Sequence, residues 1–226
     1  MKRIENIREA CKLSDQAFLF IVKKLKEGLT EKEIAKLIRY FLKEKGADLS
    51  FPIIVASGPN AYNIHNKPTD RKIKKGQPII LDFGASVRGL CSDLSRTLFL
   101  REIPSFWRNI YKITLLAQEK AYLKAQKERS AQKIDKVARD YIAKKGFGNN
   151  FIHTLGHSFG EKPHNGIVVG PKSQDTLKNG DTITIEPGIY IKGRGGVRIE
   201  DDYLVRKNKT HPLTKSPKNI KEILIK

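Results

Sequence analysis

A weak internal repeat constrains the fold of this chain more than any other feature. Residues 30–46 resemble residues 130–146 at an offset of one hundred, and identical Ile, Lys, Arg, Lys and Gly residues mark the match. Residues 73–84 resemble residues 177–188 at an offset of 104. Two matches in the same order make chance a poor explanation. We therefore expect two halves, about 1–100 and 101–226, each running helix, helix, strand, loop and hairpin.

Four amphipathic helices are predicted within this plan. Apolar residues recur at a helical period over residues 4–26, 31–45, 106–127 and 130–145. Thr30 and Glu33 form a capping-box signature before the second helix, and Gly46 and Gly146 follow the second and fourth. Strand-like apolar runs lie between the helices. The pattern favours an α/β fold with pseudo-twofold symmetry.

The composition fits a soluble, folded protein. A chain of 226 residues with 39% hydrophobic residues suits one large domain or two small ones. Cys11 and Cys91 stand far apart, so no disulfide framework is indicated. No apolar run has the length of a signal peptide core or a membrane span, and we expect a cytoplasmic protein. The net charge of +20 could serve nucleic acid or ribosome contact, but its even spread favours a solvated lysine-rich surface.

An acid-bearing stretch over residues 79–97 gives the first indication of a site. Asp82 ends an apolar run, and Asp93 follows eleven residues later. If the stretch forms a β-hairpin that turns near residues 87–88, the two aspartates lie opposite each other on one face. Two carboxylates in an apolar strand pair are unfavourable unless a cation lies between them. The stretch therefore predicts a metal site.

The repeat extends this argument to the second half. It aligns Asp82 with Glu186, so that each half carries an acid at the end of an apolar strand. Glu200 follows across the glycine-rich residues 193–196, as Asp93 does in the first hairpin. A single strand-end aspartate is usually a structural cap, but four acids at symmetric strand ends argue for a shared function. We expect the four carboxylates to converge where the two halves pack face to face.

Histidines near glycine-rich apolar segments complete the candidate site. His153 and His157 are four residues apart, which places both on one face of a strand, and the flanking Phe residues favour a strand over a helical turn. His65 and His164 lie in similar surroundings. Each alone could be a core histidine. Carboxylates with one imidazole suit Mn²⁺, Fe²⁺, Co²⁺ or Zn²⁺, and five such ligands can hold two ions that activate water for hydrolysis.

Five segments now carry a family resemblance. They are Asp-Phe-Gly at residues 82–84, Cys-Ser-Asp-Leu-Ser-Arg-Thr at 91–97, Gly-His-Ser-Phe-Gly at 156–160, Ile-Glu-Pro-Gly-Ile-Tyr at 185–190 and Gly-Val-Arg-Ile-Glu-Asp-Asp at 196–202. In this order they resemble the pita-bread metallopeptidases, and most of all their Xaa-Pro branch, aminopeptidase P and prolidase. The resemblance implies one catalytic domain over residues 1–226, with a central antiparallel sheet flanked by helices.

The resemblance also implies a ligand set for two divalent metal ions. Asp82 is similar to a ligand that gives two oxygens to one ion, and Asp93 and Glu200 to carboxylates that bridge both ions. His157 and Glu186 would hold the second ion, and Glu186 would also shuttle the proton of the bridging water. Mn²⁺ is the ion most expected, and Co²⁺, Zn²⁺ or Fe²⁺ would fit the same ligands.

Four further residues match positions with catalytic or substrate-binding roles. His65, His153 and His164 fall where the family keeps catalytic histidines, and the first and last of these would also bind substrate. Arg198 matches an arginine typical of the Xaa-Pro branch. It could hold Asp93 ionised or bind substrate.

The reaction implied is hydrolysis of the bond between an N-terminal residue and proline by a hydroxide that bridges the two metal ions. The partner is then a peptide with proline in the second position. We expect no membrane partner and a monomer or homodimer. Nucleic acid is a possible partner that the sequence does not favour, despite the net charge of +20.

Two departures from the family pattern concern the substrate end of the site. Asn165 follows His164 where the family usually has Glu. The chain also begins at the first helix of the catalytic domain, without the N-terminal domain that aminopeptidase P and prolidase carry. The preference for dipeptides or longer peptides therefore does not transfer from the family.

Two other functions remain open. A methionine aminopeptidase shares the compact size, although the segments around Arg198 and Glu186 argue against it. A non-catalytic protein on the same fold could use its basic surface to bind RNA, ribosomes or another protein. Such a relative would be expected to lose metal ligands, and all five are present in this chain.

Overall fold

The computed structural model describes residues 2–207 and 209–226. Within them lie four α-helices and two short 3₁₀ helices: α1 (Lys2–Lys24), α2 (Glu31–Glu44), α3 (Ser105–Ala125), α4 (Ala131–Lys144), η1 (Gly58–Tyr62) and η2 (Gly148–Asn150). The α-helices agree with the four predicted ones to within about two residues at each end. None of the described helices is both long and apolar enough to cross a bilayer.

Fourteen short strands form the sheets in the described residues. In the first half they are β1 (Asp48–Leu49), β2 (Ile54–Ser57), β3 (Pro78–Phe83), β4 (Ala85–Val87), β5 (Leu90–Cys91) and β6 (Leu94–Leu100). In the second half they are β7 (Gly156–His157), β8 (Val168–Val169), β9 (Thr182–Ile185), β10 (Gly188–Ile191), β11 (Gly195–Arg198), β12 (Asp201–Val205), β13 (Thr210–Pro212) and β14 (Leu224–Ile225). The predicted strand-like run over residues 49–58 is split between β1 and β2.

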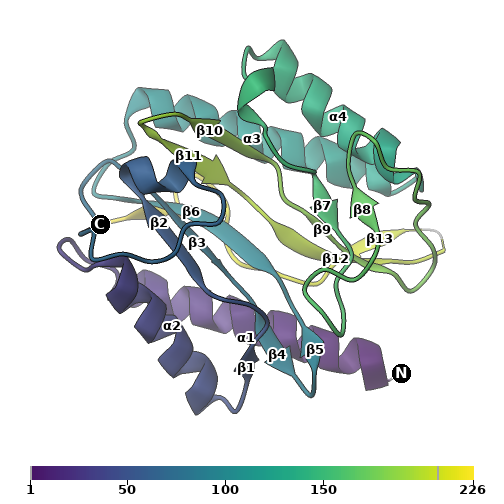
Figure 1. The fold of residues 1–226 in the computed structure, drawn as a ribbon, viewed down its shortest axis with the longest axis horizontal. Coiled ribbons are helices and arrows are strands. Elements are labelled where there is room, and N and C mark those ends of the chain that lie inside the picture. The colour runs from purple at the N-terminus through teal and green to yellow at the C-terminus, as the bar shows by residue number, and fades with distance from the viewer. Residues whose placement is uncertain (1, 208) are drawn as a thin grey trace.

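The strands lie between two pairs of helices (Figure 1). Helices α1 and α2 pack against each other on one side, and α3 and α4 on the other. One sheet has the order β14-β6-β3-β2, another the order β13-β12-β9, and β10 pairs with β11. All of these pairs are antiparallel except β14 with β6. The apolar faces of helices and strands form the main core, as the amphipathic pattern predicted.

The internal repeat reappears as matched structure. Helices α2 and α4 each span 14 residues, one hundred positions apart. Thr30 forms an isolated antiparallel bridge with Lys72, and Ser130 forms one with Thr176. The two bridges differ by offsets of 100 and 104, the same two offsets as in the sequence. Each helix is therefore tied in the same way to the segment that leads into the strand of its half.

The halves meet along β6. The Glu200 amide donates to the Ser95 carbonyl oxygen at 3.0 Å, and the Arg198 amide donates to Thr97 Oγ1 at 3.0 Å. These bonds place the segment between β11 and β12 beside β6. The ends of the apolar strands therefore converge, as the sequence predicted.

The register of the first hairpin differs from the prediction. Asp82 pairs with Ser95 and not with Asp93. The turn lies at Arg88 and Gly89, whose φ angles are 51° and 75°, because a two-residue turn of this kind needs positive φ at both central positions. This turn falls one residue later than expected and shifts the partner of Asp82 by two residues. Asp93 thus lies diagonal to Asp82 on the same face.

The helix caps of the two halves give a matched test of stability. Thr30 Oγ1 accepts from the Glu33 amide at 3.1 Å, and the Glu33 carboxylate accepts from the Thr30 amide at 2.7 Å. Ser130 Oγ has only a 3.4 Å bond from the Lys133 amide. We expect Thr30→Ala to lower the free energy of unfolding by about 1 kcal/mol and Ser130→Ala by less, as urea denaturation can measure. Equal losses would contradict this ranking of the caps.

Candidate metal centre

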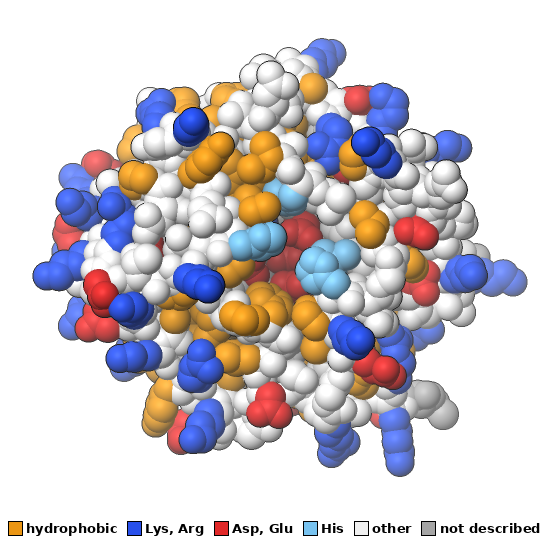
Figure 2. Space-filling view, in the orientation of Figure 1, with side chains coloured by type: hydrophobic (Ala, Val, Ile, Leu, Met, Phe, Trp, Pro, Cys, Tyr) orange, Lys and Arg blue, Asp and Glu red, His pale blue; other side chains and the backbone are white. Residues whose placement is uncertain are grey.

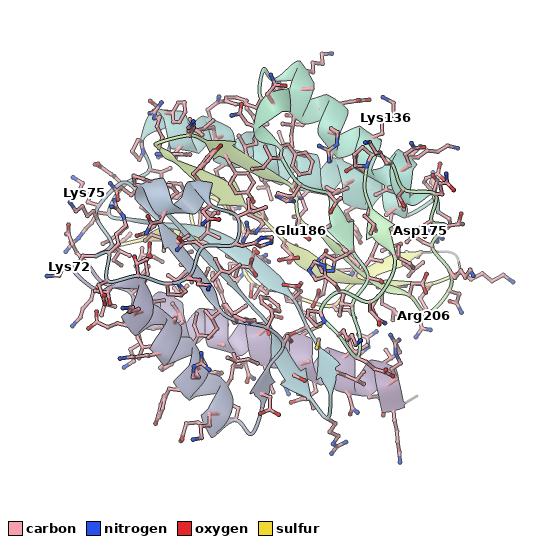
Figure 3. All side chains as sticks on the ribbon, in the orientation of Figure 1. Lys72, Lys75, Lys136, Asp175, Glu186 and Arg206 are labelled. Atoms are coloured by element: carbon pink, nitrogen blue, oxygen red, sulfur yellow. The ribbon has the colours of Figure 1, made fainter. Side chains whose placement is uncertain are left out.

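A cavity of about 570 Å³ opens near the middle of the molecule. Figure 2 shows carboxylates at its floor and histidines around its rim. The cavity is lined by all nine residues predicted for the site: His65, Asp82, Asp93, His153, His157, His164, Glu186, Arg198 and Glu200. In Figure 3, Glu186 lies at the centre of the molecule, whereas the labelled lysines lie at its edge. The fold thus brings together residues that are up to 135 positions apart in the chain.

Strand ends position the four carboxylates. Asp82 lies on β3, and Asp93 comes directly before β6. Glu186 follows β9, and Glu200 precedes β12. The registers of the β9–β12 and β10–β11 pairs, extended to these positions, place the two glutamates opposite each other. Ligand atoms of Asp93, Glu200 and His157 all lie within 4.8 Å of one another. This spacing is compact enough for a shared cation.

His157 reaches the carboxylates from the short strand β7. Its Nε2 lies 3.2 Å from Glu186 Oε1 and 3.8 Å from Asp93 Oδ2. The preceding Gly156 is required by close packing, because a Cβ there would lie 2.2 Å from the Thr184 carbonyl oxygen. The Gly-His pair of the sequence motif therefore lets the strand approach β9 closely enough to deliver the imidazole.

Burial and like charge shift the pKa values of this cluster. Burial, with repulsion from neighbouring carboxylates, raises the pKa of Asp93 and that of Glu200 well above their usual values. Burial also raises the pKa of Asp82, although Arg198 opposes the shift. The hydrogen bond with His157 overcomes burial and lowers the pKa of Glu186 to about 2.

The cluster fits divalent cation binding. Glu200 Oε2 accepts from Ser95 Oγ at 2.8 Å, but Glu200 Oε1 is buried and has no hydrogen-bond partner among the described residues. A buried carboxylate oxygen without a donor is strongly unfavourable unless a cation binds it. Four carboxylates and one imidazole form the oxygen-rich donor set that Mn²⁺, Fe²⁺, Co²⁺ and Zn²⁺ accept.

Arg198 is a buried ion-pair partner of the site. It pairs with Asp82 and not with Asp93, the acid named in one of the two roles suggested from the sequence, and the other role, substrate binding, stays a prediction. Its Nη1 donates to Tyr190 Oη at 2.8 Å, and that hydroxyl lies 3.0 Å from His153 Nε2. Because Tyr190 already accepts from the arginine, we assign its hydrogen to His153 Nε2. His153 then donates from Nδ1 to the Thr154 carbonyl oxygen at 2.7 Å.

The three remaining histidines lie at different depths. The prediction that His153 lies on a strand is wrong, because strand β7 spans only Gly156 and His157 and the backbone bends at His153. Burial lowers its pKa to about 4, so the ring is neutral at pH 7 and can accept from tyrosine. His164 is exposed and stacks on His157, with ring centroids 3.7 Å apart. His65 is exposed at the rim of the cavity.

Several functional neighbours escaped the sequence analysis. Tyr190 and Ser95 connect Arg198 to other site residues, and Asp202 Oδ2 accepts from the Asp93 amide at 2.9 Å. Ser95 could have been found, because it lies two residues after Asp93 and so on the same strand face. Nothing in the sequence identifies Tyr190 as the link between an arginine and a histidine.

Comparison with known proteins agrees with this geometry. Residues 5–207 match the model of metallopeptidase family M24. The chain is 36% identical over 220 residues to an Xaa-Pro dipeptidase of Pyrococcus furiosus, covering 97% of this chain and 63% of that protein. An Xaa-Pro dipeptidase structure from Bacillus anthracis superposes with a TM-score of 0.95 at 37% identity, covering 99% of this chain and 62% of that chain. An X-Pro aminopeptidase structure from Thermotoga maritima MSB8 superposes with a TM-score of 0.94 at 35% identity. The match covers 99% of this chain and 63% of that chain.

The fold and these matches define a pita-bread protein, as the sequence predicted. The chain belongs to metallopeptidase family M24. It spans about 63% of the length of the curated Xaa-Pro dipeptidases that it matches.

The raised pKa values predict how the metal-free protein responds to pH. A carboxylate whose pKa is higher in the folded state stabilises the fold below about pH 4, and this contribution is lost as the pH rises through the folded pKa. We therefore expect Asp93→Asn to raise the free energy of unfolding of chelated protein at pH 7 by about 1 kcal/mol or more. At pH 4.5 the difference should be smaller.

Urea denaturation in the presence of a chelator measures both values. Asp140→Asn is the matched control, because Asp140 is an exposed acid on α4 that pairs with Lys136. An Asp93 variant that is less stable than the parent protein at pH 7 would contradict the expectation.

Proposed function

We propose that this protein is a dinuclear metal peptidase that cleaves the bond between an N-terminal residue and proline. The observation that carries the proposal is the convergence of four carboxylates and one imidazole on one cavity, where a buried oxygen of Glu200 has no donor among the described residues. The names of the relatives, Xaa-Pro dipeptidase and X-Pro aminopeptidase, support the choice of substrate.

The proposed ligands are Asp82, Asp93, His157, Glu186 and Glu200. When bound, two divalent ions supply a water of lowered pKa and polarise the scissile carbonyl group. Mn²⁺ is the proposed ion, with Co²⁺, Zn²⁺ or Fe²⁺ as alternatives. Arg198 pairs with Asp82 and partly offsets the effect of burial on its pKa, which favours the ionised form that binds a cation.

Glu186 is the proposed proton carrier. Glu186 lines the cavity, and a carboxylate at this position can accept a proton from the attacking water. The same proton can then pass to the amine that leaves. His65 and His164 stand at the mouth of the cavity, where their rings can donate hydrogen bonds to the peptide. Both ring nitrogens of His153 already bond to the protein, and its predicted catalytic role remains a prediction.

The shape of the cavity supports proline at the second position. Apolar side chains of Phe51, Ile54, Ile64 and Pro163 line it beside the ligands. A pyrrolidine ring has no N–H to satisfy and can pack against such a wall without loss of a hydrogen bond. On the face that holds the cavity, Lys and Arg are scattered among acids and do not gather into one basic patch (Figure 2). This distribution favours a peptide over nucleic acid.

A peptide panel tests the proposed function. Protein loaded with Mn²⁺ or Co²⁺ is expected to release the N-terminal residue of Ala-Pro and Ala-Pro-Ala at least tenfold faster than that of Met-Ala-Ser. Preferential cleavage of the methionyl peptide would instead indicate a methionine aminopeptidase. Salt-sensitive RNA binding without any hydrolysis would indicate a binding protein.

Metal removal and one ligand variant test the dinuclear site. Chelation is expected to abolish hydrolysis, and addition of Mn²⁺ to restore it, with two ions bound per chain by elemental analysis. Asp93→Ala should lower kcat/KM by a factor of at least about 10³, because it removes a bridging ligand. Asp140→Ala, at an exposed acid, should leave kcat/KM unchanged. Full activity of the Asp93 variant would remove the dinuclear mechanism.

A further inference from the structure

A second buried carboxylate lies outside the candidate metal centre. Glu31, the first residue of α2, has no exposed surface. Its Oε1 accepts from the amide and the hydroxyl of Ser57 at 2.7 and 2.9 Å. Its Oε2 accepts from the amide and the hydroxyl of Thr69 at 3.0 and 2.7 Å. Asn60 Nδ2 lies 3.1 Å from both oxygens.

The donors to Glu31 are all neutral in the part of the chain that the structure describes. They are amide and hydroxyl groups, so no cationic side chain competes for the carboxylate. The positive end of the α2 dipole also favours a negative charge at its first residue. Because every partner is a donor, an acceptor-only carboxylate suits this position and an amide does not.

These hydrogen bonds hold the chain on both sides of residues 64–68, which form one wall of the cavity. The five consecutive residues 64–68 line the cavity. Ser57 and Asn60 are tied to Glu31 before this wall, and Thr69 is tied to it directly afterwards. Asn66, inside the wall, donates to Glu31 at 3.4 Å and to the Val55 carbonyl oxygen at 3.0 Å. One carboxylate therefore holds both ends and the middle of the segment.

We infer that Glu31 is a positioning residue for the peptide substrate. It fixes the wall that carries His65 and Lys67, two exposed side chains that face the cavity. Glu31 does not line the cavity itself and so acts through this wall. The inference rests on the proposed function, because it assigns the 64–68 wall to peptide binding.

The main test uses Glu31→Gln with Glu33→Gln as its matched control. The amide introduced by Glu31→Gln would point a donor at the donors of Asn60 and Thr69, whereas Glu33 is an exposed capping residue of the same helix turn. For Glu31→Gln we expect amide hydrogen exchange over residues 57–69 to rise at least tenfold, with β3 and β6 unchanged. KM for Ala-Pro should rise at least fivefold, with kcat and Mn²⁺ content changing less than twofold. Glu33→Gln should change none of these values more than twofold.

Two further variants keep the inference testable if Glu31→Gln does not fold. Thr69→Val removes one hydroxyl donor at an exposed position and should raise KM two- to threefold. Glu31→Asp keeps the charge, and its KM should rise less than that of Glu31→Gln. In a His65→Ala background, Glu31→Gln should raise KM less than it does in the parent protein, because both changes act on the same wall.

Two results would overturn the inference. One is unchanged exchange over residues 57–69 in folded Glu31→Gln or Thr69→Val protein. The other is exchange that rises equally throughout the chain, which would give Glu31 a general structural role. If the parent protein cleaves no proline peptide, the proposed function fails, and the exchange pattern alone still decides whether Glu31 fixes the wall.

Discussion

Burial of like charges is the constraint on which the rest of this structure depends. Asp93 and Glu200 lie within a few ångströms of each other, and both side chains are almost fully buried. Carboxylates in such a place protonate unless positive charge is fixed nearby. Arg198 supplies that charge for Asp82, and His157 supplies it for Glu186. Glu200 keeps one oxygen without a donor among the described residues, and a cation bound there would relieve the repulsion within the cluster.

A second group of buried charged residues holds the backbone next to the proposed ligands Asp93 and Glu200. Arg96 is buried and donates to the carbonyl oxygens of Ser95 and Glu200, and it also pairs with Asp201. Lys218 and Gln118 donate to the other oxygen of Asp201, so this group is satisfied without the metal centre. The backbone of both ligand-bearing segments is therefore fixed independently of any ion. Ligands held in this way lose little freedom when a metal binds, which favours tight binding.

The sequence predicted the general plan well because its signals are periodic or covalently local. Helix periods, caps and the offsets of 100 and 104 depend on neighbours in the chain, and the structure retains them. The hairpin register was wrong because one positive-φ residue, Arg88, moves the turn by a single position. The partner of Arg198 depends on packing between the two halves, and no spacing rule distinguishes Asp82 from Asp93. Nothing in the sequence distinguishes Glu31 from an ordinary first-turn acid, because its donors come from residues 26 to 38 positions later.

In each half, a charged side chain of the second helix holds the segment that carries a cavity histidine, but the charge differs in sign. In the second half, Arg139 on α4 pairs with Asp135 and donates to the carbonyl oxygens of Phe151 and His153. The segment that carries His153 is thus held through its backbone by a charged pair. In the first half, Glu31 on α2 holds the segment that carries His65 through hydroxyl and amide groups. Both sets of hydrogen bonds are charge-assisted, because an ionised guanidinium donates in one half and an ionised carboxylate accepts in the other. The pseudo-symmetric frame therefore holds the His65 and His153 segments from equivalent helices, with a carboxylate on α2 and a guanidinium on α4.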